Sequence, residues 1–375
     1  MKRIFLYSAG LLLLAAGCTK IDKEPSGEEW VWDESLPVPI SFESGGGLSV
    51  ETKAAITDLN GIDIGLFAMS VNKVKDDPDN NNKPNWKFAD EVGTGTRLLI
   101  NEKVQTDENG TIVVKDKYYP NDNQYNYSFY AYAPYSDSYE PGTGWERVNF
   151  DLGETDIIYG EAHASILGSG VQNKEFGFKA SYIRYVKGSL PDREDLLPKI
   201  NFKHLLTGMS FYAMLAEEGE GESNVTVKSI RIMNTATSVS LYIADNNWDD
   251  ADGNMTGKFR QKGENSTLFV RGSENALDYK LHYNDYNEGS GPIGQLFLMP
   301  GNDYEIRVDY ETATEGEPVS TFAEAKLSRA GGFVAGTNYS IKLKITPLAK
   351  MEINTDITDW KSQEGPEISL GGGNE

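Results

Sequence analysis

Apolar and polar residues alternate with a period of two in many short runs of this chain. In residues 37–43, Val38, Ile40 and Phe42 alternate with proline, serine and glutamate. This period is typical of a half-buried β-strand. Pro37 and Pro39 have no amide hydrogen for a sheet ladder, so we expect an edge or first strand.

Turn residues separate the runs that follow. Asn60-Gly61 predicts a turn before a strand over 62–69, and the polar, proline-containing run 76–85 predicts a surface loop. Residues 101–120 predict a hairpin around Asn109-Gly110, a pair that accepts the positive φ of a type I′ turn.

The run 118–135, YYPNDNQYNYSFYAYAPY, holds eight Tyr or Phe residues among eighteen. One face of the predicted strand would carry Tyr125, Tyr127, Phe129, Ala131 and Ala133. The other would carry Asn126, Ser128, Tyr130 and Tyr132. The pattern favours a central sandwich strand, buried on one side and partly covered on the other. The alternative is a sugar-stacking platform made of Tyr130, Tyr132 and Tyr135.

The second half repeats short alternating runs at regular spacing, which is typical of a β-sandwich. A charged segment with glycine and two prolines precedes it, so we place a domain boundary near residue 190. The expected fold is all-β, with one sandwich over 37–190, a second over 191–370 and a tail over 371–375.

The start of the chain has the pattern of an export signal. A basic pair precedes an apolar run that is too short to span a bilayer, so we interpret residues 1–17 as a signal peptide. Cys18, the single cysteine, follows Ala16-Gly17 as in a lipobox, although Ala15 stands where leucine is usual. We predict a lipidated Cys18, a tether over 18–36 and no disulfide within the chain.

Charge and motifs exclude several functions. The net charge of −22 argues against a nucleic-acid partner, because phosphate binding needs a basic surface. Catalytic signatures such as G-x-S-x-G and H-E-x-x-H are missing from the sequence, so we expect no enzyme, no cofactor and no metal. His204 lies between apolar neighbours and is expected to be a packed, hydrogen-bonded histidine. The acidic loop 245–257 departs from the calcium-binding pattern at Trp248 and Phe259, so it reads as a solvated loop.

Four stretches together resemble the fimbrillin-like lipoproteins of Bacteroidota, the subunits of type V pili. They are KYYPNDNQYNYSFYAYAPY, TDIIYGEA, INFKHLLTGMSFYAM and the C-terminal ITDW. The resemblance runs from the lipobox to Trp360. It implies two transthyretin-like β-sandwich domains, export as a lipoprotein to the outer membrane, and a structural or tip subunit of a surface fimbria that supports adhesion.

The resemblance also implies assembly by strand exchange with other fimbrial subunits. A protease would cut between Lys53 and Ala54 and release the strand of Val38, Ile40 and Phe42. A neighbouring subunit would then supply a strand, which we place in Met351–Leu370. Lysine stands where related proteins often carry arginine. If Lys53 is an ordinary loop residue, the chain is an uncleaved anchor or accessory subunit.

A second hypothesis is a monomeric surface lipoprotein that binds glycans for an uptake system. Its basis is the lipid anchor together with the tyrosine- and tryptophan-rich surface. The first strand separates the two hypotheses, since only the fimbrial one requires it to be removable.

Overall fold

The structure is a computed structural model, and strands dominate the residues that it describes. These are residues 35–42, 56, 59–71, 97–108, 110–121, 126–142, 144–162, 178–181, 183, 197–215, 224–245, 254–274, 276–283, 291–313, 317–346, 350–357 and 368–370. Besides strands they contain helical residues at 180, 181 and 183 and the 3-10 turn Val270–Gly272. The predicted all-β class is confirmed.

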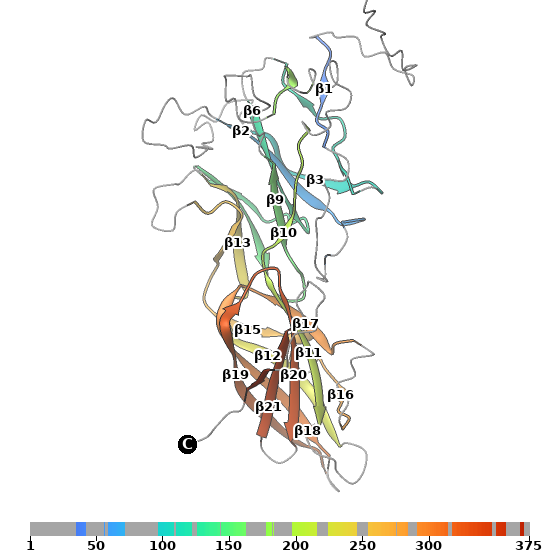
Figure 1. Cartoon of the computed structure of the whole chain (residues 1–375), viewed down its shortest axis with the longest axis vertical. Coiled ribbons are helices and arrows are strands. Elements are labelled where there is room, and N and C mark those ends of the chain that lie inside the picture. Colours follow the sequence, from blue (N-terminus) through green and yellow to red (C-terminus); the bar gives the residue numbers. More distant parts are fainter. Residues whose placement is uncertain are drawn as a thin grey trace, which may run out of the picture. The chain divides into compact units, whose positions relative to one another are not determined.

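Strands between residues 64 and 204 form a six-stranded sheet in the order β10-β9-β6-β2-β3-β4 (Figure 1). Its strands are β2 (Ile64–Val71), β3 (Arg97–Thr106), β4 (Ile112–Val113), β6 (Asn126–Ala133), β9 (Ile158–Ala162) and β10 (Lys203–His204). A separate pair joins β1 (Val38–Pro39) to β5 (Tyr118–Tyr119).

Strand β6 is buried on both faces, which explains its aromatic composition. Tyr127 and Phe129 point into a core cluster shared with β1 and β5. Tyr130 and Tyr132 point into a second cluster on the opposite face of the sheet. The prediction that the aromatic run is a central core strand is therefore confirmed. A buried aromatic ring removes about 150–250 Å² from water, so this strand contributes strongly to stability.

A four-stranded sheet covers the second face, in the order β14-β13-β8-β7. Its strands are β7 (Tyr139–Pro141), β8 (Trp145–Asp151), β13 (Ser238–Asp245) and β14 (Lys258–Gln261). Val148 and Leu241 from this sheet join Phe67 and Tyr132 from the six-stranded sheet in one core cluster.

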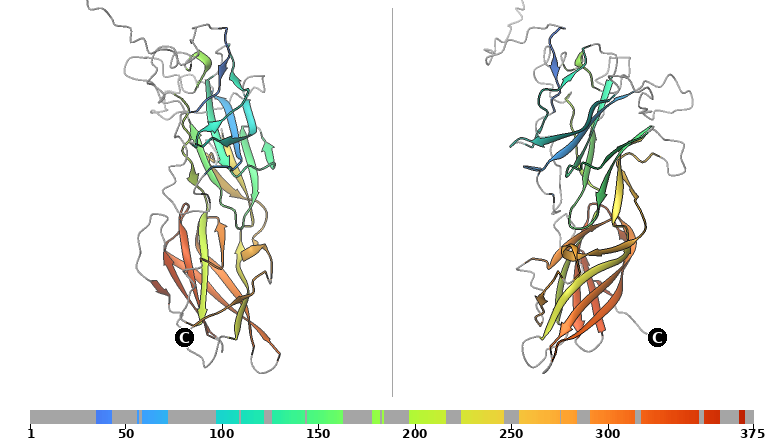
Figure 2. Two further views of the ribbon diagram at one scale, coloured as in Figure 1. Left: turned by 90° about the vertical axis from the view of Figure 1, so that its right-hand side faces the viewer. Right: turned by 180° about the vertical axis from the view of Figure 1, so that it is seen from behind.

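The second half contains two facing sheets (Figures 1 and 2). One sheet, in the order β17-β11-β20-β21-β22, consists of β11 (Thr207–Leu215), β17 (Gly294–Leu298), β20 (Asn338–Thr346), β21 (Lys350–Ile357) and β22 (Ile368–Leu370). The other, in the order β15-β12-β18-β19 with β16 also on β12, consists of β12 (Val225–Thr235), β15 (Ser266–Phe269), β16 (Tyr279–Lys280), β18 (Gly301–Thr312) and β19 (Val319–Phe333). Apolar side chains of both sheets fill one core, as in a β-sandwich.

Strand pairing crosses residue 190, where we predicted a boundary. β10 pairs with β9, and β13 pairs with β8 over Ser238–Asp245 and Trp145–Asp151. Only Ala236 and Thr237 separate β12, in the sandwich of the second half, from β13. The division into domains at 37–190 and 191–370 stays a prediction.

Both predicted turns are present, one with a different geometry. Gly61 has φ +76°, and Ile62 N donates to Leu59 O over 3.0 Å. The hairpin joins β3 to β4, but Gly110 N donates to Asp107 O over 3.0 Å, so Gly110 ends the turn instead of standing at its centre. The expected type I′ turn is wrong, because Asp107 closes a longer loop by also accepting from Thr111 N through its side chain.

Candidate functional site

The first strand is buried as its alternation predicted. Val38, Ile40 and Phe42 have relative exposures of 1%, 2% and 6%. The Phe42 ring packs edge-on against Phe129, with centroids 5.1 Å apart. Each such side chain contributes about 1.5–3 kcal/mol when it is withdrawn from water.

The backbone of β1 is held far less than its side chains. Within the part of the chain that the structure describes, its ladder pairing is with β5, with Val38 opposite Tyr119 and Pro39 opposite Tyr118. One further bond runs from Ile40 N to Lys117 O over 3.0 Å. Among the described contacts of this strand, the buried side chains therefore outweigh the short backbone pairing.

Tyr119 lies opposite Val38 on β5, and both side chains belong to the same core cluster. Its ring packs edge-on against Phe129 at 6.1 Å, and 2% of the residue is exposed. Within the described part of the chain its hydroxyl oxygen has no hydrogen-bond partner. Burial raises the pKa of this hydroxyl well above its usual range. A buried hydroxyl without a partner destabilises the closed arrangement.

The predicted donor segment, Met351–Leu370, includes two described strands. β21 pairs antiparallel with β20, and β22 pairs antiparallel with β21 at Thr355–Ile368 and neighbouring positions. In this structure the segment completes a sheet of its own chain. Residues 358–367 between the two strands lie outside the described residues.

The three tyrosines of the sugar-platform alternative have different surroundings. Tyr130 and Tyr132 have exposures of 3% and 0%, so no sugar can stack on them in this structure. Tyr132 lies over Gly65, its cross-strand partner, and its hydroxyl donates to Asn101 Oδ1 over 2.6 Å. Tyr135 is half-buried, with the Lys103 ammonium 5.3 Å from its ring centroid.

His204 is a packed histidine, as expected. Its Nδ1 lies 2.5 Å from Asp156 Oδ2, and both side chains are buried. Asp156 Oδ1 accepts from Ile157 N, and Leu205 N donates to Ile157 O. These contacts join the start of β9 to β10. Among the described residues no group of three His, Cys, Asp or Glu is placed to hold a metal.

Several predicted positions cannot be located. Cys18, Lys53 and Ala54 lie outside the described residues, as do residues 246–253 of the acidic loop. The base of that loop is ordered by Asp245, whose carboxylate accepts from Met255 N over 2.9 Å. Within the described ranges no helix is long and apolar enough to cross a membrane.

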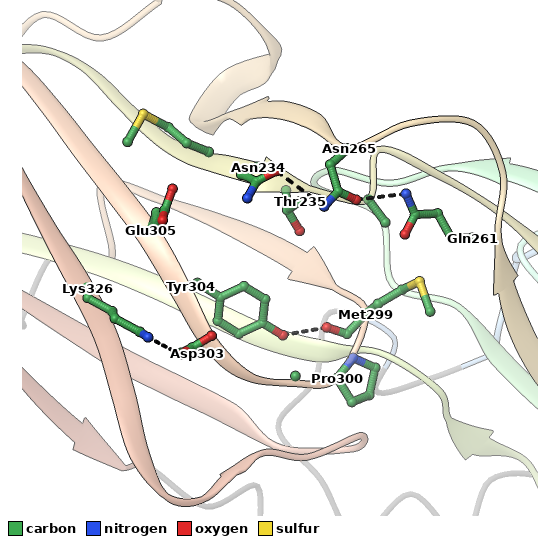
Figure 3. A pocket seen from close by; sticks show the side chains of 13 residues that line it. Asn234, Thr235, Gln261, Asn265, Met299, Pro300, Asp303, Tyr304, Glu305 and Lys326 are labelled. Carbon is green, nitrogen blue, oxygen red and sulfur yellow. Dashed lines mark hydrogen bonds and ion pairs between the residues drawn. The ribbon is translucent and has the colours of Figure 1, made fainter.

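A second feature is a polar hollow of about 290 Å³, which we call the β12–β18 hollow (Figure 3). It lies where the end of β12, the β14–β15 connection and the start of β18 meet. Its lining includes Asn234, Asn265, Asp303, Tyr304, Glu305 and Lys326. Sequence reasoning missed it, because its side chains come from four separate segments with no shared motif.

Sequence reasoning also missed a buried carboxylate at the start of β8. Glu146 is 1% exposed and accepts from the Tyr139 hydroxyl, and its second oxygen pairs with the Arg97 guanidinium. Burial raises the pKa of Glu146, and the bonds from Tyr139 and Arg97 oppose that shift. Val148 and Phe150 mark one face of this strand, and the period of two places Glu146 on the same face, which was the available signal.

Comparison with known proteins decides the family. The fimbrillin-like family model matches residues 52–360. The chain belongs to the fimbrillin-like family. The resemblance seen in the sequence is thereby confirmed, and membership supports a cell-surface, fimbrial, structural protein that assembles with other subunits.

Two solved structures of Bacteroides proteins are also similar to this fimbrillin-like chain. A Bacteroides uniformis protein assigned to cell adhesion has 15% identity and a TM-score of 0.44, covering 88% of this chain and 100% of its own. A Bacteroides vulgatus fimbrial protein has 13% identity and a TM-score of 0.44, covering 86% and 100%. None of the curated proteins compared with the chain matches it.

Proposed function

We propose that this chain is a structural subunit or tip adhesin of a cell-surface fimbria, assembled by protease-triggered strand exchange. The observation that supports it is the contrast, in β1, between deep side-chain burial and short backbone pairing. Its side chains Val38, Ile40 and Phe42 are deeply buried, whereas its backbone pairs with β5 over two residues. A strand held in this way can be replaced by another that offers similar side chains.

In the proposed sequence, Cys18 is lipidated and carries the subunit to the outer membrane. Cleavage between Lys53 and Ala54 then separates β1 from the rest of the chain. When the strand leaves, the apolar sites that its side chains occupied beside Phe129 and Tyr119 become empty. A segment within Met351–Leu370 of a neighbouring subunit fills them, and head-to-tail repetition produces a filament.

The glycan-uptake alternative has less support. Its basis was the lipid anchor together with a tyrosine- and tryptophan-rich surface, and two of the tyrosines considered for it, Tyr130 and Tyr132, are buried. We therefore retain the fimbrial role as the proposal.

The first test uses protein extracted from the surface of its own cells. Mass and N-terminal sequence should give Ala54 as the first residue, and unboiled samples should form a ladder on a denaturing gel. Lys53→Ala should abolish both, whereas Lys75→Ala, in another polar run of the first half, should change neither. A full chain that keeps a lipidated Cys18 and forms no ladder would contradict the proposal.

A second test locks the strand in place. Pro39 and Tyr118 face each other across the β1–β5 pair, and the Cα separation in such pairs matches that of a disulfide. The double variant Pro39→Cys/Tyr118→Cys should keep β1 in place after cleavage and stop polymerisation until a reductant is added. Each single variant is the control and should polymerise without reductant. Equal polymerisation of the oxidised double variant would show that release of β1 is not required.

A further inference from the structure

The β12–β18 hollow contains a directed chain of side-chain amides. Gln261 Nε2 donates to Asn265 Oδ1 over 2.7 Å, and Asn265 Nδ2 donates to Asn234 Oδ1 over 3.3 Å (Figure 3). Each amide accepts from the one before it, and the bond from Asn265 orients the exposed carboxamide of Asn234. Its NH₂ group is the terminal donor of the chain.

The backbone also positions Asn234. Its φ is +50°, a left-handed value that asparagine tolerates better than most residues. It lies in the part of β12 where the pairing register with β15 shifts between Ile232 and Thr235. Irregularities of this kind redirect a side chain out of the regular strand pattern. Here the redirected side chain lines the hollow.

Acceptors lie on β18, the neighbour of β12 in the same sheet. Asp303 pairs with the Lys326 ammonium, and Glu305 lines the hollow on the same strand as Asp303. These three groups together carry one excess negative charge. Tyr304 lies between the two carboxylates in sequence and is 8% exposed, with its hydroxyl donating to Met299 O. Met299 and Pro300 add apolar surface beside it.

We propose that the β12–β18 hollow binds a neutral saccharide. A sugar hydroxyl both donates and accepts, so it can take the Asn234 amide hydrogen and give its own proton to the Glu305 carboxylate. The C–H face of a sugar ring would rest on Met299 and Pro300. The hollow, at about 290 Å³, is close to the lower end of small-molecule sites, about 300–1,000 Å³. The excess negative charge disfavours acidic sugars and phosphates.

The experiment is a saturation-transfer NMR and calorimetric titration of the full chain. The probes are the methyl glycosides of glucose, galactose, mannose and N-acetylglucosamine, with N-acetylneuraminic acid as the anionic comparison. At least one neutral glycoside should bind, and the anionic sugar should not. Asn234→Asp, which removes the donor, and Asn234→Gly, which tolerates the same φ, should each weaken binding about tenfold.

A second position keeps the test decisive if the Asn234 variants fold poorly. Glu305→Gln changes an exposed side chain and should weaken binding by a similar factor, since a charge-assisted bond is lost. Glu108→Gln, on the exposed β3–β4 turn, is the matched control and should leave binding unchanged. The proposal is overturned if no neutral glycoside binds, if the anionic sugar binds best, or if binding survives the Asn234 and Glu305 substitutions intact. None of these outcomes depends on polymerisation.

Discussion

Asp156 and His204, 48 residues apart in the chain, form a buried pair with Oδ2 and Nδ1 2.5 Å apart. The pair links the segment before β9 to β10, the outermost strand of the six-stranded sheet. Both residues belong to stretches that identified the family in the sequence. Their contact therefore joins two of those stretches in the folded protein.

Replacing Asp156 by alanine should destabilise the fold by about 3–5 kcal/mol, because His204 and Ile157 N would lose a buried acceptor. Urea unfolding followed by tryptophan fluorescence would measure the change. The matched control is Asp63→Ala, which removes an exposed pair with Lys103 and should have little effect. Equal effects of the two substitutions would contradict the importance given to burial.

Tyr119→Phe should stabilise the protein by about 1 kcal/mol. The substitution removes a buried hydroxyl that has no partner within the described residues and keeps the ring packed on Phe129. The same change at Tyr132 should destabilise, because that hydroxyl donates to Asn101. Thermal unfolding of both variants beside the parent protein tests the predicted gain and loss of stability. A loss of stability in Tyr119→Phe would refute the prediction.

Gly65→Ala should cost about 1–3 kcal/mol and disturb the aromatic strand. A Cβ at this position would lie 2.2 Å from Cε1 of Tyr132, far inside contact distance. The ring cannot move freely, since its hydroxyl is bonded to Asn101. Near-ultraviolet circular dichroism should lose tyrosine signal as stability falls. Gly153→Ala is the control, because a Cβ there meets nothing within 4 Å.

Glu146 should make the fold less stable as pH rises above about 4.5, its ordinary pKa. Its folded-state pKa is raised by burial, so the unfolded state releases its proton first. The stabilisation is full below the unfolded-state pKa and is lost as pH rises through the folded-state value. Unfolding free energies from pH 3 to 8 should therefore fall in the parent relative to Glu146→Gln over that interval. A constant difference between the two proteins would disprove the shift.

Glu140 should change stability with pH in the opposite direction to Glu146. Bonds from Arg147, Asn149 and Lys262 lower the pKa of Glu140 to about 2. Its contribution is present above the unfolded-state value of about 4.5 and is lost as pH falls towards about 2. The parent should thus lose stability relative to Glu140→Gln on acidification. The effect should be small and should weaken with salt, because the carboxylate is 37% exposed.

Local patterns predicted those features that depend on local physics. Alternation identified the buried side chains of β1, and the two faces of β6 were assigned correctly from the period of a strand. Burial of the second face of β6 was underestimated, since the sheet that covers it includes β13, about a hundred residues later. The sequence around Tyr130 contains no signal that β13 would cover this face. The β12–β18 hollow was unpredictable for the same reason, because its donors and acceptors meet only after folding.

The connection between β12 and β13 has a mechanical consequence. Only Ala236 and Thr237 lie between a strand paired to β18 and a strand paired to β8. A pulling force that enters through the second-half sandwich passes into the four-stranded sheet with almost no slack to take up. The antiparallel hydrogen-bond ladders β12–β18 and β13–β8 resist this force, and no flexible linker stretches between them. Under flow at a cell surface, this junction would transmit tension before it extends.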